Sequence, residues 1–215
     1  MNGVAKFLSW VTLPLFTPMY ALLVVFFVPA QSSSMKVMDT LYLYPWEAKA
    51  LFLLLFLVFI VLAPGMSLIV LRVNRSISSL ELPNQQERET PIMVMVFYTT
   101  VLYLFLWYQS DANVVPPVLL AMALGGMIST LTAYLLNKRF KISLHGIGLG
   151  ALVGFLYTYF LGLEKFDIAI LIYAVLLAGL GLTARLILKQ HNLFQIFAGF
   201  SLGFASQFFC VYFYV

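Results

Sequence analysis

Seven stretches of the chain contain no Asp, Glu, Lys or Arg, and each is long enough for a helix to cross a membrane. A crossing needs about 20 apolar residues, with a range of about 17–25. Backbone N–H and C=O groups in lipid must be hydrogen-bonded within the protein, which only helices and closed β-barrels achieve. The stretches do not alternate apolar and polar residues as the strands of a membrane barrel do, so each predicts a helix. The stretches are 7–35, 50–71, 90–110, 112–137, 142–163, 168–184 and 190–215.

The composition excludes a soluble protein. Hydrophobic residues make up 63% of the chain and charged residues 9%, whereas a soluble domain carries about 25% charged residues. Such a chain cannot cover its surface with water-compatible groups, which rules out a soluble enzyme and a free nucleic-acid binder. We expect an all-α, polytopic membrane helix bundle of about seven helices, forming a single integral-membrane domain over residues 1–215. Pro14, Pro18 and Pro64 lie inside the first two stretches and predict kinks there.

The basic residues indicate the orientation in the membrane. If seven helices alternate in direction, only Lys36, Lys49 and Lys165 fall on one side. The other side, with the N-terminus, carries Lys6, Arg72, Arg75, Arg88, Lys138, Arg139, Lys141, Arg185 and Lys189. The positive-inside rule places this richer side in the cytoplasm. We therefore expect a multi-pass protein of a bacterial inner membrane, with the lipid bilayer as its surroundings.

Both histidines of the chain fall on this basic side, at the start of two different stretches. His145 opens the fifth stretch, and His191 opens the seventh, six residues after Arg185. Arg88 lies in the loop before the third stretch, and Lys141 and Ser143 lie just before His145. Taken singly, such residues snorkel to the surface and contact lipid headgroups. Because three loops bring them to one face, the set also predicts a site.

Phosphate chemistry suits these residue types. Guanidinium, ammonium and hydroxyl groups hold phosphate oxygens, and arginine does so with two parallel hydrogen bonds. Two histidines beside a phosphate can divide the work, one attacking phosphorus while the other protonates the departing alcohol. This chemistry needs no metal and no cofactor, and one cysteine with two histidines cannot form a Cys/His metal cluster.

Glycines indicate how the histidines could meet. Gly146, Gly150 and Gly154 repeat every four residues in the fifth stretch, as Gly199 and Gly203 do in the seventh. Small residues at this spacing let membrane helices approach closely. We expect these two helices to pack together, which would bring their first residues, including the histidines, to one interface.

These residues resemble the motifs of the type 2 phosphatidic acid phosphatase superfamily of membrane lipid phosphatases. Its third motif consists of Ser-Arg, five residues, His, three residues and Asp. Arg185 and His191 match the Arg and His of this motif at the same spacing, and Gln195 occupies the position of the Asp. Its second motif reads P-S-G-H, of which Ser143 and His145 match. Its first motif reads K, six residues, R-P, where Arg88 matches the Arg. Ala184 and Glu81 stand where the family has Ser and Lys. The resemblance covers a phosphatase-like core over residues 81–205.

The resemblance implies a catalytic role for each histidine. His191 would be the nucleophile that forms a phosphohistidine, and His145 the acid for the leaving alkoxide and then the base for water. Arg185, Ser143 and Arg88 would bind phosphate and stabilise the charge in transfer. Lys141 joins this group by proximity alone. Gln195 lies four residues after His191 on the same helical face and could orient its ring, but it cannot supply a negative charge.

Three functions follow as alternatives. The first is hydrolysis of a phosphomonoester or pyrophosphate of a membrane lipid through a phosphohistidine. The second is a non-catalytic protein of the same fold that binds or transports a lipid phosphate, which Gln195 favours. The third, an ion transporter or channel, is disfavoured because the centres of the stretches contain no ionisable Asp, Glu, Lys or Arg for a relay. The sequence does not indicate an oligomeric state.

Overall fold

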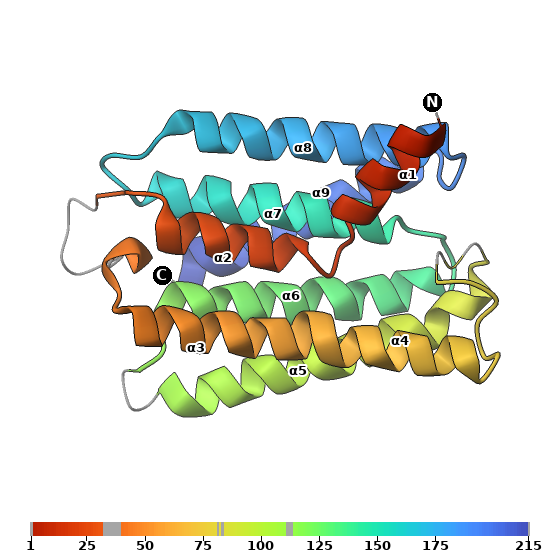
Figure 1. Cartoon of the computed structure of the whole chain (residues 1–215), viewed down its shortest axis with the longest axis horizontal. Coiled ribbons are helices and arrows are strands. Elements are labelled where there is room, and N and C mark those ends of the chain that lie inside the picture. The colour runs from red at the N-terminus through yellow and green to blue at the C-terminus, as the bar shows by residue number, and fades with distance from the viewer. Residues whose placement is uncertain (1, 32–39, 81, 83, 111–113, 215) are drawn as a thin grey trace.

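The computed structural model describes residues 2–31, 40–80, 82, 84–110 and 114–214 as a bundle of long, roughly antiparallel helices (Figure 1). In this described part the protein is all-helical and has no β-strand beyond one isolated bridge between Gln31 and Lys165. Lys36 and Glu81, which entered the sequence argument, lie outside the described residues.

Within the described residues, six helices are long and apolar enough to cross a membrane, as an integral multi-pass protein requires. Each corresponds to one of the last six uncharged stretches of the sequence. The first of them is the continuous helix Trp46–Val73, which contains α3 (Trp46–Phe56), a π-helical segment (Leu57–Leu62) and α4 (Ala63–Val73). The others are α5 (Glu89–Ser110), α6 (Pro117–Asn137), α7 (Leu144–Leu161), α8 (Ile168–Ile187) and α9 (Leu193–Tyr214).

The stretch 7–35 does not form the single helix that the sequence led us to expect. It contributes to two short helices, α1 (Asn2–Val11) and α2 (Thr17–Phe27), which meet at an angle in Figure 1. Pro14 lies in the break, where its missing N–H and its ring prevent a continuous helix. Pro18 falls in the first turn of α2, a position that tolerates proline. The break lets α1 pack on α8 while α2 packs on α7.

The π-helical segment Leu57–Leu62 precedes Pro64 in the helix Trp46–Val73. A proline inside an α-helix cannot donate to the carbonyl of the residue four positions earlier and clashes with it. A wider π turn relieves that clash and is a known cause of local bending. The kink expected at Pro64 is thus a change of helical pitch, and the helix continues across it.

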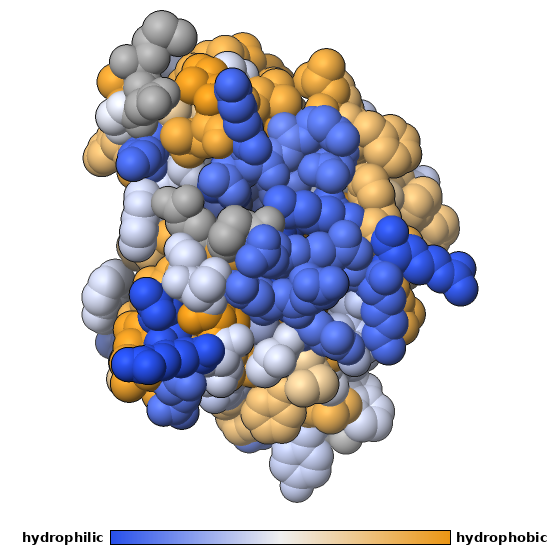
Figure 2. Space-filling model, turned by 90° about the vertical axis from the view of Figure 1, so that its right-hand side faces the viewer, coloured by the Kyte–Doolittle hydropathy of each residue, from blue (hydrophilic) through white to orange (hydrophobic). Residues whose placement is uncertain are grey.

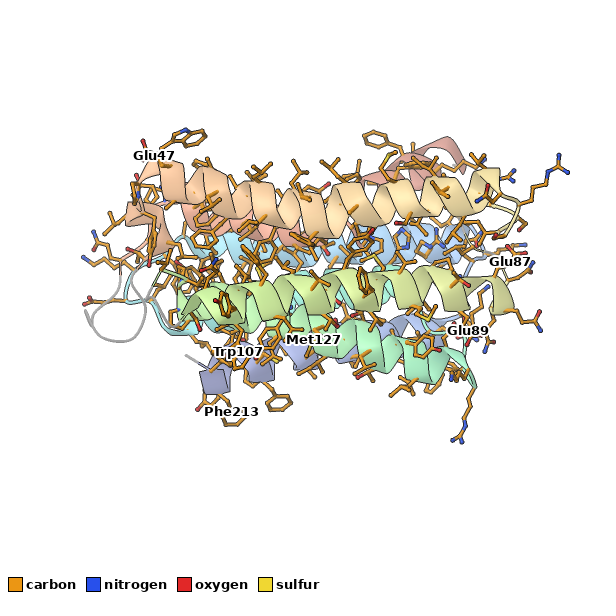
Figure 3. All side chains as sticks on the ribbon, turned by 90° about the horizontal axis from the view of Figure 1, so that it is seen from below. Glu47, Glu87, Glu89, Trp107, Met127 and Phe213 are labelled. Atoms are coloured by element: carbon orange, nitrogen blue, oxygen red, sulfur yellow. The ribbon has the colours of Figure 1, made fainter. Side chains whose placement is uncertain are left out.

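The helices place the basic loops at one end of the bundle. The N-terminus and the loops α4–α5, α6–α7 and α8–α9 lie at the right-hand end of Figure 1. Figure 3 shows the same division, with Glu47 at one end and Glu87 and Glu89 at the other. This is the end to which the alternation of helices assigned both histidines, and we refer to it as the basic end.

The central helix is α7, most of whose residues are buried, and it packs most extensively against α9. The expected glycine contact between the two helices is confirmed. A Cβ added at Gly146 would lie 2.9 Å from the carbonyl oxygen of Ile196, and one added at Gly199 would lie 2.5 Å from that of Ser143. Only glycine permits this backbone approach, which fixes the starts of α7 and α9 against each other.

Candidate functional site

A cavity of about 430 Å³ lies at the basic end and contains the four central residues of the predicted site. Arg88, His145, Arg185 and His191 all line it, although they come from three different loops and helix ends. The rest of the lining is mostly apolar, with Lys6 as a further cation, and comes from α1, the α1–α2 break, the helix Trp46–Val73, α5, α6, the start of α7 and the neighbouring loops. None of the lining residues that the structure describes is an Asp or a Glu.

Arg88 is held by two backbone carbonyl groups. Its side chain is 2% exposed, with Nε donating to the carbonyl oxygen of Leu82 (2.8 Å) and Nη1 to that of Ile142 (3.1 Å). The neighbouring Glu87 does not neutralise it, because the Glu87 carboxylate accepts hydrogen bonds from Ser78 and Asn84. Arg88 therefore lines the cavity with its side chain fixed by two carbonyl groups and with its charge not offset by Glu87.

Arg185 enters the cavity from the last turn of α8, and Ser9 on α1 contacts it. Nη1 of Arg185 donates to the hydroxyl oxygen of Ser9 at 2.8 Å, and the arginine is 4% exposed. Ser9 is a site residue that our sequence analysis missed. The signal was present, since a serine in an apolar stretch beside the N-terminal lysine calls for a partner, but nothing in the sequence pairs it with α8.

His145 contacts the same serine through its backbone. Nε2 of His145 lies 3.1 Å from the carbonyl oxygen of Ser9 and 3.5 Å from its hydroxyl. Because a carbonyl oxygen can only accept, Nε2 carries the hydrogen and Nδ1 carries the lone pair. Ser9 thus joins α1 to α7 and α8 and holds both a histidine and an arginine at the cavity.

His191 is oriented by Gln195, as the spacing of the two residues had indicated. Nδ1 of His191 lies 2.9 Å from Oε1 of Gln195, and the same oxygen accepts from the backbone N–H of Asn192 at 3.3 Å. Asn192 in turn accepts from the backbone N–H of Gln195 at 2.9 Å, which completes a reciprocal cap at the start of α9. Since the Asn192 N–H requires an oxygen there, His191 Nδ1 is the donor and Nε2 carries the lone pair.

Burial and neighbouring cations keep His191 neutral. Desolvation is the main cause that lowers its pKa to about 4, and the charge of Arg88 is the next. The hydrogen bond to Gln195 acts in the opposite direction, and Arg185 and Lys141 lower the pKa further. At neutral pH the ring is therefore an uncharged imidazole, whose unprotonated nitrogen is available as a nucleophile.

Three residues of the predicted site do not line the cavity. The hydroxyl oxygen of Ser143 accepts from the N–H of Gly146 (3.1 Å) and caps α7, so the serine is occupied structurally. Lys141 Nζ donates to the carbonyl oxygen of Gln190 at 3.3 Å, and desolvation lowers the pKa of this amine. Gln195 lies behind His191 rather than at the cavity.

Figure 2 views the molecule from the basic end and shows hydrophilic residues gathered over its centre, with hydrophobic residues around much of the edge. Among the described residues, no group of three or more His, Cys, Asp and Glu is placed to hold a metal ion.

Comparison of the chain with protein-family models, with curated proteins and with solved structures gives no significant match. In its described residues the chain is a helical protein with six apolar helices long enough to cross a membrane and, at one end, a cavity whose lining includes two arginines and two histidines.

Proposed function

We propose that the cavity binds the phosphate group of a membrane lipid and hydrolyses its phosphomonoester or pyrophosphate, in the manner of the type 2 phosphatidic acid phosphatases. In this proposal α1 and α2 together form the first of seven crossings, and residues 81–205 form the phosphatase-like core. The observation that carries it is the cavity itself, into which two buried arginines and two histidines face without a carboxylate in the described lining.

Burial makes an anion the expected occupant of such a site. Arg88 and Arg185 are 2% and 4% exposed, and two guanidinium charges on one cavity repel each other in a low dielectric. Two guanidinium groups on one cavity attract an anion, whose opposite charge offsets the repulsion between the guanidinium groups. A phosphate is such an anion, and its oxygens accept charge-assisted hydrogen bonds from each guanidinium.

The reaction follows from the two histidine tautomers. Nε2 of His191 attacks phosphorus, so the P–N bond forms as the bond from phosphorus to the lipid oxygen breaks. A bound phosphate monoanion transfers its own proton to Nδ1 of His145, and His145 then gives that proton to the departing alkoxide. Water next attacks the phosphohistidine while His145 accepts one of its protons, and the P–N bond breaks to restore His191. His145 then passes that proton to the released phosphate, so both histidines return to their neutral forms.

A phosphate-release assay on purified protein in detergent, with a panel of lipid phosphates and pyrophosphates, tests this function. We expect turnover by the wild type, no measurable turnover by His191→Ala, and a large loss with Arg185→Gln. Arg139→Gln is the matched control, because Arg139 is an exposed arginine at the same end that does not line the cavity. Absence of turnover by the wild type, or unchanged turnover by His191→Ala, would contradict hydrolysis.

A second candidate function is binding or transport of the same lipid phosphate without hydrolysis. It is favoured by Gln195, a neutral residue where a nucleophilic histidine is best supported by a carboxylate, and by Ser143, whose hydroxyl caps a helix. Saturable phosphate binding by both wild type and His191→Ala, with no phosphate released by either, would establish this alternative.

The proposed orientation places the site at the cytoplasmic face of a bacterial inner membrane. With Arg88, Lys141 and Arg185 set aside for the site, the basic end still carries Lys6, Arg72, Arg75, Lys138, Arg139 and Lys189. Reporter fusions at the two termini test this. The N-terminus lies at the basic end and the C-terminus at the other, so a cytoplasmic C-terminal reporter would overturn the orientation.

A further inference from the structure

The cavity extends well beyond the residues that a phosphate group would contact. Besides the arginines and histidines, its lining includes Val61 from the π-helical segment, Leu68 from α4 and Met95 from α5. From Val61 to the end of the helix at Val73 is a rise of roughly 18 Å, at about 1.5 Å per residue. The apolar part therefore reaches toward the middle of a hydrocarbon layer about 30 Å thick.

The cavity also reaches the outer surface between two helices. Trp10 on α1 and Ile69 on α4 both line it, yet they are 56% and 48% exposed. In the membrane such residues contact lipid, because they lie on the outside of the bundle. A ligand with its charged end at Arg88 and Arg185 can therefore extend along an apolar path to the rim formed by Trp10 and Ile69.

Its volume limits what can lie inside. Small-molecule sites commonly enclose about 300–1,000 Å³, and this cavity has about 430 Å³. That space holds a phosphate group with the first part of one hydrocarbon chain, and the second chain of a two-chain glycerol lipid would have to leave the cavity through the same opening at Trp10 and Ile69.

From charge, depth and volume together we infer that the ligand is a single-chain lipid phosphate, with one acyl or prenyl chain in the apolar part of the cavity. This inference rests on the proposed phosphate site and adds the class of lipid. The guanidinium groups select the headgroup, and apolar lining residues such as Val61, Leu68 and Met95 contact the chain.

Gly65 offers a direct way to fill the apolar part. It lines the cavity, and a Cβ added there would meet no atom within 4 Å, so a side chain can start at this position without moving backbone. Gly179 on α8 is the matched control, since a Cβ there also meets nothing within 4 Å but the residue is exposed and does not line the cavity.

The experiment compares affinities for inorganic phosphate, a lysophosphatidate with one oleoyl chain and a phosphatidate with two, using purified wild type, Gly65→Leu and Gly179→Leu. We expect wild type to bind the lysophosphatidate more tightly than the phosphatidate. Gly65→Leu should weaken lysophosphatidate binding by at least about 10-fold, as when two methylene groups leave an apolar site. Inorganic phosphate should bind all three proteins equally.

Equal affinity for the one-chain and two-chain lipids, or an unchanged lysophosphatidate affinity in Gly65→Leu, would overturn the inference while leaving the phosphate site intact. Failure of every protein to bind inorganic phosphate or lipid would instead overturn the proposed function. Trp10 provides a second measurement that needs no change to the cavity. With Trp46→Phe and Trp107→Phe as background, a lysophosphatidate brominated on its chain should quench Trp10, and unchanged fluorescence would overturn the inference.

Discussion

The α7–α9 side of the cavity and the α1–α4 side differ in how closely their backbones approach. On the first side a Cβ added at Gly146 would lie 2.9 Å from a carbonyl oxygen of α9, whereas on the second side a Cβ at Gly65 meets nothing within 4 Å. Both histidines stand at the start of the tightly packed helices. The comparison indicates that the reacting groups are fixed by backbone contact, while the lipid-facing side leaves room for a ligand.

Gly203→Ala should disrupt the close contact between α7 and α9, and we expect it to have the largest effect of the variants on stability. The added methyl group would fall on the carbonyl oxygen of Ile147 and lie 2.8 Å from the backbone nitrogen of Ala151. Because backbone cannot rotate away as a side chain can, we expect a loss of about 3 kcal/mol in the free energy of unfolding. Denaturation of the purified protein in mixed micelles measures it.

The matched control is Gly126→Ala on α6, where the new methyl group has no neighbour within 4 Å. Alanine stabilises a helix relative to glycine by up to about 1 kcal/mol, so this variant should be no less stable than the wild type. If Gly203→Ala unfolds at the same denaturant concentration as Gly126→Ala, the close packing of α7 and α9 does not fix the histidines.

The second prediction adds the carboxylate that the site lacks. In Gln195→Glu an oxygen still accepts from His191 Nδ1, which lies 2.9 Å from Oε1 in the wild type, and a negative charge now faces the ring. The charge raises the pKa of His191 from about 4 and stabilises the cationic ring during transfer. We expect kcat to rise by about 10²-fold, within the range that acid–base partners contribute.

Gln190→Glu serves as the control for Gln195→Glu, because it puts the same charge in the same loop without the contact to Nδ1. The pH profile of kcat/KM separates the two, since only Gln195→Glu should move its acidic limb upward. Equal rate increases in both variants would mean that net charge, and not the oriented imidazole, is responsible.

Sequence reasoning predicted the helical membrane bundle and named four of the residues that line the cavity, for identifiable reasons. Uncharged stretches located the six long helices, because lipid forbids charge and open backbone, and the glycine spacing predicted the α7–α9 contact. The break at Pro14 and the pairing of Ser9 with Arg185 could not be predicted, since both depend on where α1 packs. Ser143 matched a motif, yet its hydroxyl caps α7, a role that spacing alone does not distinguish.

The third prediction concerns Ser9, the residue that ties the lipid-facing side to the histidine side. Ser9→Ala removes the oxygen that accepts from Arg185 Nη1 but keeps the backbone carbonyl that accepts from His145. Loss of a hydrogen bond to a charged group should disorient the guanidinium and weaken inorganic phosphate binding by about 10-fold. Isothermal titration measures it.

Ser9→Thr should restore the affinity, because it keeps a hydroxyl at the same position. Thr12→Val is the control on the same helix. The Thr12 hydroxyl donates to the carbonyl oxygen of Leu8, and Thr12 does not line the cavity. Equal weakening in Thr12→Val would show that Ser9 acts only by holding α1 in place.

The last prediction, with the smallest expected effect, concerns pH. Acid should lower the stability of the ligand-free protein, and it should raise the affinity of the cavity for an anion. The pKa of His191 is about 4 in the folded protein, below its ordinary value of about 6.5. Between these values the unfolded chain binds more protons, so stability falls as pH falls from about 6.5 to about 4. His191→Gln should reduce this slope, which denaturation at pH 7 and pH 4.5 measures.

An anion in the cavity attracts the protonated imidazole and raises the pKa of His191, so linkage requires the anion to bind more tightly as pH falls. Inorganic sulfate is the probe, because its charge does not change over this range. We therefore expect acid to destabilise the ligand-free protein and to strengthen sulfate binding, with both trends weakened in His191→Gln. Sulfate affinity that is independent of pH in the wild type would mean that no anion reaches His191, and that the tightly packed side of the cavity takes no part in binding.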